Sequence, residues 1–294
     1  MTLSVLIPTY NYNARVLVES MAQLASAESI THEIIVGDDA STCETEWLAA
    51  VEGREDVRVL HNPVNLGRAR NRNRMAEAAR GEWLLFIDCD AQVETAFSLR
   101  TYLQAGEHVL VVCGGLHHPA SNPNPKASLR YAYERRADRY RSATHRQQHP
   151  YEQLSTFNLL VRRDVFLAIR FDEQCTQYGY EDVLFGADLQ RHGISILHID
   201  DPLLHVGLEP NDVFLAKTET ALHTLHQLGQ RMKGHSRLAT TANRLRRWHL
   251  APACALAFRL LHRPLRHNLL SAHPSLTLFS LYKLGYFLQL QTKR

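Results

Sequence analysis

Two aspartates, Asp88 and Asp90, stand one residue apart directly after the apolar stretch 83–87. Side chains two apart on an extended segment point to the same side. Two carboxylates held that close repel each other unless a cation lies between them or one of them is protonated. Mg²⁺ and Mn²⁺ prefer oxygen ligands, which they share with substrate phosphates. The triplet therefore predicts a metal–diphosphate site; the alternative is a solvated turn that caps the strand.

The elements that must position this triplet alternate between strands and helices. Apolar runs typical of buried strands cover residues 3–8, 33–36, 57–60 and 83–87. Stretches with helical spacing separate these runs at residues 16–24, 46–51 and 68–79. Such alternation predicts an α/β fold with a mainly parallel central sheet and right-handed crossovers.

Polar side chains follow each of the four expected strands. They occupy positions 9–11, 38–39, 65–67 and 88–90. Ligands of open parallel sheets bind beyond the carboxyl ends of the strands. Each cluster alone is compatible with turn chemistry, but four clusters at the same edge of one sheet predict a single binding site.

The four strand ends belong to a longer series of motifs along the chain. Six motifs occur at residues 4–11, 33–41, 65–71, 86–90, 157–163 and 178–186. In their order and spacing over roughly the first 220 residues, they resemble the family-2 glycosyltransferases with the GT-A fold. This resemblance implies a Rossmann-like catalytic domain, to which we assign residues 1–230.

The resemblance also implies which residues hold the nucleotide of a sugar donor. Pro8 and Thr9 at the end of the first strand, together with Asp39, would contact the base and ribose, with Asp39 accepting from the base edge. Arg70 would lie near the nucleotide or its diphosphate. Asp88 would contact the ribose or bridge to a metal ion.

A metal ion in this reading is Mn²⁺ or Mg²⁺, and Asp90 is its expected ligand with Asp88 beside it. His205 follows a short expected strand at 195–199, in a segment whose apolar residues indicate order. Some GT-A enzymes place a histidine there, and an imidazole ligand favours Mn²⁺ over Mg²⁺. The alternative is an ordinary loop histidine in a chain that has 17 of them; His117, His118 and His198 are expected to be surface or structural residues.

Glycosyl transfer also requires a base that removes the proton of the acceptor hydroxyl. By resemblance Asp182 would be this base, and transfer would invert the anomeric centre. Asp182 opens an expected helix, whose dipole favours the ionised carboxylate. Glu181 would bind the acceptor or sugar hydroxyls. The alternative for both residues is the acidity common at helix N-termini.

The charge of the chain is unevenly distributed. No Asp or Glu follows Glu219, and the 75 residues after it hold 12 Lys and Arg. Two apolar runs, 250–261 and 276–290, are shorter than the roughly 20 residues of a membrane-spanning helix. We therefore expect residues 231–294 to form a basic helical extension that lies on an anionic membrane surface. The alternative is a helical hairpin packed on the catalytic domain.

Cysteine content bears on localisation, and one polar helix bears on the acceptor. Five cysteines without paired spacing favour a reducing compartment, so we expect a cytoplasmic protein, peripheral on the cytoplasmic face of the membrane. A helix rich in Tyr and Arg, 126–141, would contact an acceptor such as a diphosphate lipid; the alternative is an exposed helix of mixed charge. We expect no nucleic-acid partner, because residues 1–219 are acidic and carry no such motif.

The sequence thus predicts an enzyme that transfers a hexosyl or N-acetylhexosaminyl group from a nucleotide sugar, with a UDP-sugar as the expected donor. The acceptor would be a glycan or a lipid-linked molecule in polysaccharide or glycoconjugate synthesis. One alternative is a non-catalytic scaffold of the same fold. Another is a sugar-nucleotide nucleotidyltransferase, but that enzyme requires a Gly-rich basic loop after the first strand, and residues 9–13 do not form one.

Overall fold

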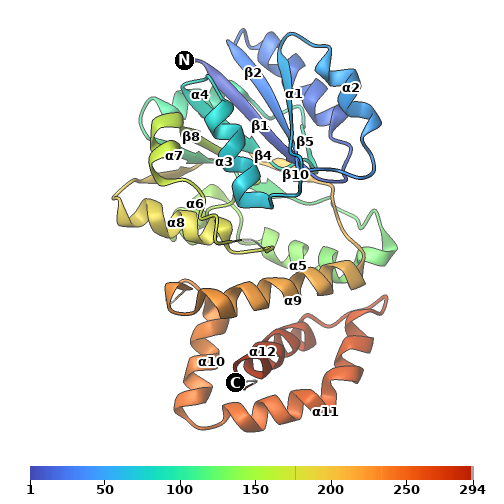
Figure 1. The fold of residues 1–294 in the computed structure, drawn as a ribbon. Helices are drawn as coiled ribbons and strands as arrows, with labels where there is room; N and C mark the ends of the chain where they lie inside the picture. Colours follow the sequence, from blue (N-terminus) through green and yellow to red (C-terminus); the bar gives the residue numbers. More distant parts are fainter. Residues whose placement is uncertain (176, 233, 293–294) are drawn as a thin grey trace. The chain divides into compact units, whose positions relative to one another are not determined.

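The computed structural model describes residues 1–175, 177–232 and 234–292 (Figure 1). Their contacts form two compact units. The first unit comprises residues 1–118, 140–175 and 181–207, and the second comprises 119–139, 177–180, 208–232 and 234–292. The boundary predicted from the sequence lies between residues 230 and 231. In the structure, the C-terminal segment of the second unit begins at Leu208, and the unit also includes the two earlier segments.

The first unit is built on a seven-stranded sheet with the order β3-β2-β1-β4-β8-β6-β9. In chain order its strands are β1 (Leu3–Thr9), β2 (His32–Asp38), β3 (Val57–His61), β4 (Trp83–Ile87), β6 (Val111–Cys113), β8 (Asn158–Arg162) and β9 (Ile196–His198). Only β8 runs antiparallel to its neighbours, and the other pairs within this sheet are parallel. The prediction of an α/β fold with a mainly parallel sheet is confirmed.

Helices cover both faces of this sheet because its strands are apolar on both sides. In β1, Leu3, Val5 and Ile7 pack into one core cluster, with α1 (Arg15–Ala27), α2 (Glu46–Glu52) and α4 (Leu99–Gly106). Leu6 points the other way, into a second cluster. That cluster includes side chains of α3 (Arg68–Ala78), α7 (Arg163–Ile169) and α8 (Glu181–Arg191). A short helix, α6 (Ala143–Arg146), completes the helices of this unit.

A small second sheet positions His205. Its order is β5-β10-β7, formed by β5 (Ala91–Gln92), β10 (Leu203–His205) and β7 (Leu116–His117). In the antiparallel ladder between β10 and β5, His205 pairs with Ala91, the residue after Asp90. His205 is therefore part of a strand and not of a loop.

The second unit is helical. It contains the 3₁₀ turns η1 (Pro125–Ala127) and η2 (Gly229–Met232) and the helices α5 (Ser128–Asp138), α9 (Asn211–Leu228), α10 (Arg237–Arg247), α11 (Ala251–Leu269) and α12 (Leu276–Thr292). The helix expected at 126–141 is largely α5, and its aromatic and basic residues are not all free. The Tyr133 ring lies 5.6 Å from that of Phe279, and the Arg130 guanidinium lies over Phe214.

The basic extension forms a hairpin inside this unit. Phe258 of α11 packs against Gly285 of α12, where an added Cβ would lie 2.4 Å from the phenylalanine ring. Phe258 and Tyr282 share a buried cluster with residues of α5 and α9. Within the described ranges, no helix is both long and apolar enough to cross a membrane.

Candidate active site

The Asp88-Cys89-Asp90 triplet forms a turn between β4 and β5 rather than an extension of β4. The amide of Ala91 donates to the carbonyl of Asp88 at 3.0 Å and closes the turn. The two carboxylates consequently have different partners. Asp88 Oδ1 accepts from Arg72 at 2.6 Å, and Asp90 Oδ2 lies 3.0 Å from His205 Nε2. The prediction that both side chains point the same way is wrong for this backbone, and neither carboxylate is merely solvated.

The polar residues of α3 hold the surrounding loops in place. Asn71 Nδ2 donates to the carbonyl of Gly37 near the end of β2, at 2.8 Å. Asn73 exchanges two hydrogen bonds with the backbone of Phe171, at 2.9 and 3.0 Å. Buried amides need such partners because an unpaired polar group is costly in the interior. This helix therefore links the carboxyl edge of the sheet to the segment that precedes α8.

Arg72 is the buried centre of the site. Its side chain is 1 % exposed, and its guanidinium donates from Nη2 to Asp88 and from Nη1 to Glu181 Oε1 at 3.3 Å. One planar guanidinium thus connects the turn after β4 with the first turn of α8. Burial raises the pKa of Glu181, but the charges of Arg68 and Arg72 outweigh it, so this pKa lies below its usual value.

Asp182 lies next to Glu181 but has a different environment. Burial and the negative charge of Glu181 raise the pKa of Asp182 to about 7, against smaller opposing effects of the Val183 amide, Arg72 and Arg68. Among the described residues, the only hydrogen bond to its carboxylate comes from the Val183 amide. The two neighbouring acids therefore differ: Glu181 is held as an anion by arginine, whereas Asp182 takes up a proton near neutral pH.

The backbone directly before α8 has an unusual conformation. Gly179 and Tyr180 both have positive φ, of 101° and 72°. This region favours glycine, and a tyrosine there stores backbone strain.

Asp90 and His205 are the two candidate metal ligands that the structure brings together. Val206 N donates to the carbonyl of Asp90 at 3.0 Å, and Gly207 provides the space that the Asp90 carboxylate occupies. A Cβ at Gly207 would lie 2.5 Å from the Asp90 Cβ. Burial raises the pKa of Asp90, but the hydrogen bond with His205 and the charge of Arg68 bring it below its usual value.

The donor set at this position is compatible with a divalent cation of the Mg²⁺ or Mn²⁺ type. In the described ranges, no group of three or more His, Cys, Asp and Glu is arranged to hold a metal. Mg²⁺ needs no such cage, because it binds through one or two carboxylates and completes its shell with water and substrate phosphate. Asp90 supplies one such carboxylate, and the imidazole Nε2 of His205, 3.0 Å from Asp90 Oδ2, adds a nitrogen ligand. Asp88 faces Arg72 instead.

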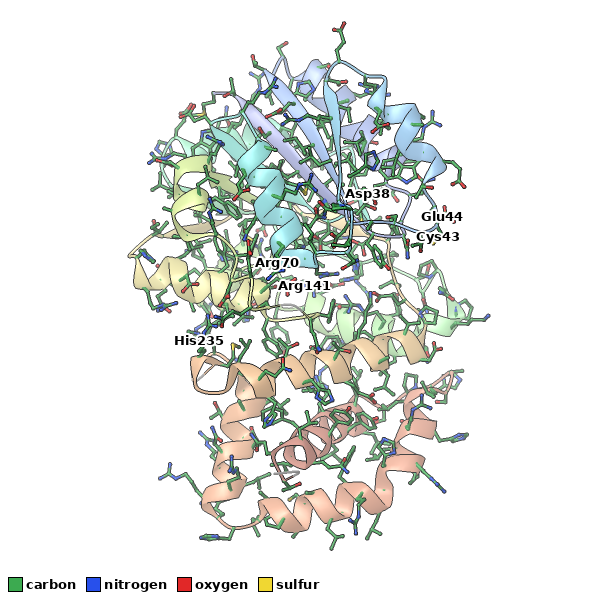
Figure 2. The ribbon with its side chains drawn as sticks, in the orientation of Figure 1. Asp38, Cys43, Glu44, Arg70, Arg141 and His235 are labelled. Atoms are coloured by element: carbon green, nitrogen blue, oxygen red, sulfur yellow. The ribbon has the colours of Figure 1, made fainter. Side chains whose placement is uncertain are left out.

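The residues predicted to hold the nucleotide lie at the expected edge of the sheet. Pro8 and Thr9 end β1, and the Asp39 amide donates to the Thr9 carbonyl at 2.9 Å. The Thr9 hydroxyl donates to the carbonyl of Tyr12 at 2.8 Å. Asp38, at the end of β2 in Figure 2, accepts from the Ser41 amide at 3.1 Å and supports the turn.

Asp39 is 4 % exposed and holds the loop after β3. Its carboxylate accepts from the amides of Leu66 and Gly67 and from Asn62, at 2.8, 2.9 and 2.8 Å. Gly67 has φ of 80°, a conformation that favours glycine and brings its amide to the carboxylate. In this arrangement Asp39 shapes the loop, and its contact with a nucleotide base stays a prediction.

Arg70 is not directed at the acidic cluster. Half of its side chain (labelled in Figure 2) is exposed, and its Nε lies 3.4 Å from Glu173. Arg68 lies 3.6 Å from Glu181 and contributes positive charge at Asp90 and Asp182. Arg68 and Arg72 stand four residues apart, so they share one face of α3, while Arg70 lies on another. That i, i+4 spacing was the sequence signal that could have identified the two arginines.

One further histidine differs from expectation, and a second agrees with it. His118 is 2 % exposed, and its Nε2 lies 2.9 Å from His205 Nδ1, so it belongs to the site. No pattern around His118 indicated this, because the contact joins β10 to the segment after β7. His198 is structural, as expected: it is buried, lies 2.7 Å from Arg146 Nη1, and burial lowers its pKa to about 4.

Comparison with known proteins agrees with this geometry. The model of glycosyl transferase family 2 matches residues 4–170, more than half of the chain. The chain belongs to glycosyl transferase family 2. The match ends before α8, so Glu181 and Asp182 lie outside it.

Two curated relatives and one solved structure are similar to this family-2 chain. A protein described as an uncharacterized glycosyltransferase from Haemophilus influenzae is 37% identical over 91 residues, which cover 30% of this chain and 29% of that protein. An uncharacterized protein of Mycobacterium tuberculosis is 35% identical over 88 residues, covering 30% and 27%. The alignments thus span less than a third of these relatives.

The crystal structure of residues 1–349 of S. aureus TarS superposes with a TM-score of 0.51 at 18% identity. It covers 100% of this chain and 93% of that one. At this identity the similarity concerns the fold, and it supports the GT-A assignment.

Replacing Arg72 by Gln is expected to destabilise the protein by about 3–5 kcal/mol, because Glu181 would remain buried with only the longer ion pair to Arg68, and Asp88 would lose its arginine. Urea denaturation measures this change. Arg70→Gln is the matched control, and its exposed ion pair predicts a change below about 1 kcal/mol. The double variant Arg72→Gln/Glu181→Gln should recover part of the loss. Strictly additive effects of the two substitutions would contradict the bridge.

Asp182→Asn is expected to stabilise the protein at pH 8 but not at pH 4. The folded-state pKa of about 7 exceeds the usual aspartate value. Between these values the folded state keeps a proton that the unfolded state has lost, so wild-type stability falls as pH rises through this window. Asparagine removes the effect, worth on the order of 2–4 kcal/mol above pH 7.

Melting temperatures at pH 4 and pH 8 measure this difference between wild type and Asp182→Asn. Asp164→Asn is the control: the guanidinium of Arg162 lowers the pKa of this exposed carboxyl, so its loss should not stabilise the protein at pH 8. A stabilisation by Asp182→Asn that is the same at both pH values would show that Asp182 is not protonated near neutral pH.

Proposed function

We propose that the chain transfers a hexosyl or N-acetylhexosaminyl group from a UDP-sugar to a hydroxyl of a glycan or lipid-linked acceptor, with inversion at the anomeric carbon. The observation that carries the proposal is Asp182. It is a carboxyl group at the start of α8 with a pKa raised to about 7. Its neighbour Glu181 is linked to Asp88 through the guanidinium of Arg72. A general base is most effective when its pKa lies near the operating pH.

Each residue of the site has a role in this reaction. Asp182 takes the proton of the acceptor hydroxyl as that oxygen attacks the anomeric carbon, and the bond to the diphosphate breaks. Arg68, whose side chain is half exposed beside Glu181, offers a cation to the leaving diphosphate. Arg72 orients Asp88 toward the donor ribose and keeps Glu181 ionised beside the base. Pro8, Thr9 and Asp39 form the edge at which the nucleotide binds.

Asp90 and His205 would hold a Mn²⁺ or Mg²⁺ ion. When bound, such an ion supplies Lewis-acid stabilisation of the charge that develops on the leaving diphosphate. Asp90 is suited to this because its lowered pKa keeps it ionised at neutral pH. Asp88 would join this set only if it left Arg72.

Asp182→Asn tests the proposed base directly. Because the amide cannot accept a proton, transfer should fall by about 10³-fold or more, while donor affinity stays within about twofold of wild type. Release of UDP from UDP-sugars with Mn²⁺ measures turnover, and calorimetry measures donor binding. Transfer by Asp182→Asn at near the wild-type rate would make another group the base. No turnover and no UDP binding by the wild type would favour the non-catalytic scaffold.

We further propose that the second unit binds an anionic membrane through one surface of α10 and α11. This α10–α11 surface consists of Trp248, Leu250, Leu256 and Leu260 with Arg244, Arg247, Arg259 and Arg263. Trp248 is 67% exposed and Leu260 72% exposed. Exposed apolar side chains interleaved with arginines are typical of helices that lie in a lipid interface.

The full chain is therefore expected to sediment with phosphatidylserine-containing vesicles, but weakly with pure phosphatidylcholine vesicles. Each arginine near the surface contributes about 1 kcal/mol, and salt should screen this attraction. Trp248→Ser/Leu260→Ser should reduce binding about tenfold or more. Val213→Ser, at an exposed position of α9, is the matched control. Equal sedimentation of both variants, or none by the wild type, would contradict this docking surface.

A further inference from the structure

A chain of hydrogen bonds, buried at its centre, leads from Arg141 to Asp90. Arg141 Nη1 lies 3.0 Å from His118 Nδ1, and His118 Nε2 lies 2.9 Å from His205 Nδ1. His205 Nε2 in turn lies 3.0 Å from Asp90 Oδ2. All four residues belong to the first unit, and Arg141 is labelled in Figure 2.

The direction of every bond in this chain follows from arginine. A guanidinium only donates, so His118 Nδ1 must accept and the His118 proton must be on Nε2. That proton is donated to His205 Nδ1, which leaves the proton of His205 on Nε2, where it is donated to Asp90. Arg141 thus determines the tautomers of two histidines without touching Asp90.

Packing prevents the rings from evading this constraint by rotation. His118 and His205 are 2 % and 6 % exposed. Their rings meet edge to face at 5.0 Å, and Phe157 contacts His205 in the same manner at 5.2 Å. His205 is also fixed by the ladder between β10 and β5.

This tautomer opposes metal binding by His205. A nitrogen that carries a proton cannot ligate a cation, so ligation through Nε2 requires the His205 proton to be on Nδ1. His118 Nε2 would then accept that proton's hydrogen bond, and the proton of His118 would be on Nδ1. There it would face the N–H of Arg141, and two donors cannot share a hydrogen bond.

We propose that Arg141 is a positioning residue that acts through His118: it keeps His205 donating to Asp90 and must release His118 before His205 ligates a divalent cation. The proposal rests on the metal role proposed above for Asp90 and His205. Each histidine carries one proton before and after the change, so both rings stay neutral and no net proton is released. Without the ion, Arg141 donates to His118 and His205 donates to Asp90. With the ion bound to Asp90 and His205, both of these hydrogen bonds are absent.

The metal-free protein provides the first test, which does not depend on activity. Long-range ¹H–¹⁵N spectra of the full chain with labelled histidine distinguish Nδ1–H from Nε2–H rings. Loss of signals in His118→Gln and His205→Gln assigns the two rings. We expect both to be Nε2–H without metal and both to become Nδ1–H when Mg²⁺ is added. An Nδ1–H form of either ring in the metal-free protein, or unchanged tautomers after Mg²⁺, would overturn the proposal.

Affinity for Mn²⁺, measured by electron paramagnetic resonance, provides the second test. Arg141→Gln offers an amide oxygen that can accept from His118 Nδ1–H, so Mn²⁺ should bind about tenfold more tightly than to wild type. Arg141→Lys keeps a donor and should stay close to wild type. Equal affinities of the Gln and Lys variants would overturn the proposal. If Asp90→Asn leaves Mn²⁺ binding unchanged, the proposed metal role of Asp90 is refuted. The metal-free spectra would still show whether Arg141 determines the tautomers of His118 and His205.

Discussion

The buried guanidinium of Arg72 is the interaction on which the rest of the site depends. Its two terminal nitrogens are 2.6 Å from Asp88 and 3.3 Å from Glu181, so one rigid group fixes the distance between the turn after β4 and the start of α8. A buried arginine without both carboxylates would be strongly unfavourable, and so would either acid without the arginine. The same arrangement keeps Glu181 charged, and this charge is one cause of the raised pKa of its neighbour Asp182. A structural ion pair thereby tunes the proposed base.

The turn at 88–90 divides two carboxylates that are close in sequence between two networks. Asp88 belongs to the arginine network of α3, and Asp90 belongs to the histidine network that passes through His205 to Arg141. Arg72 contacts Asp88, and Asp90 accepts a hydrogen bond from His205 near the charge of Arg68, so both acids are stabilised without a metal ion. A cation at Asp90 would therefore enter a site whose carboxylate already accepts a hydrogen bond, and it would have to replace that bond.

The second unit illustrates where composition is a poor guide to boundaries. The absence of acids after Glu219 indicated a distinct extension, and helices α10, α11 and α12 do occupy it. Yet α9 and the earlier helix α5 share their core, in which Leu129, Phe214 and Phe279 pack together. Charge determines what a surface attracts, whereas the extent of a folded unit is determined by which apolar faces bury one another.

The sequence by itself determined the fold class and the sheet edge that carries the site, because strand periodicity and polar strand ends depend only on local order along the chain. It also identified Asp90, His205 and Asp182 as residues worth testing. Only the tertiary structure decided that Asp88 faces Arg72, that His118 touches His205, and that Arg70 points elsewhere. The first two contacts join residues 16 and 87 positions apart, and their geometry depends on side-chain directions and burial that a linear pattern does not encode.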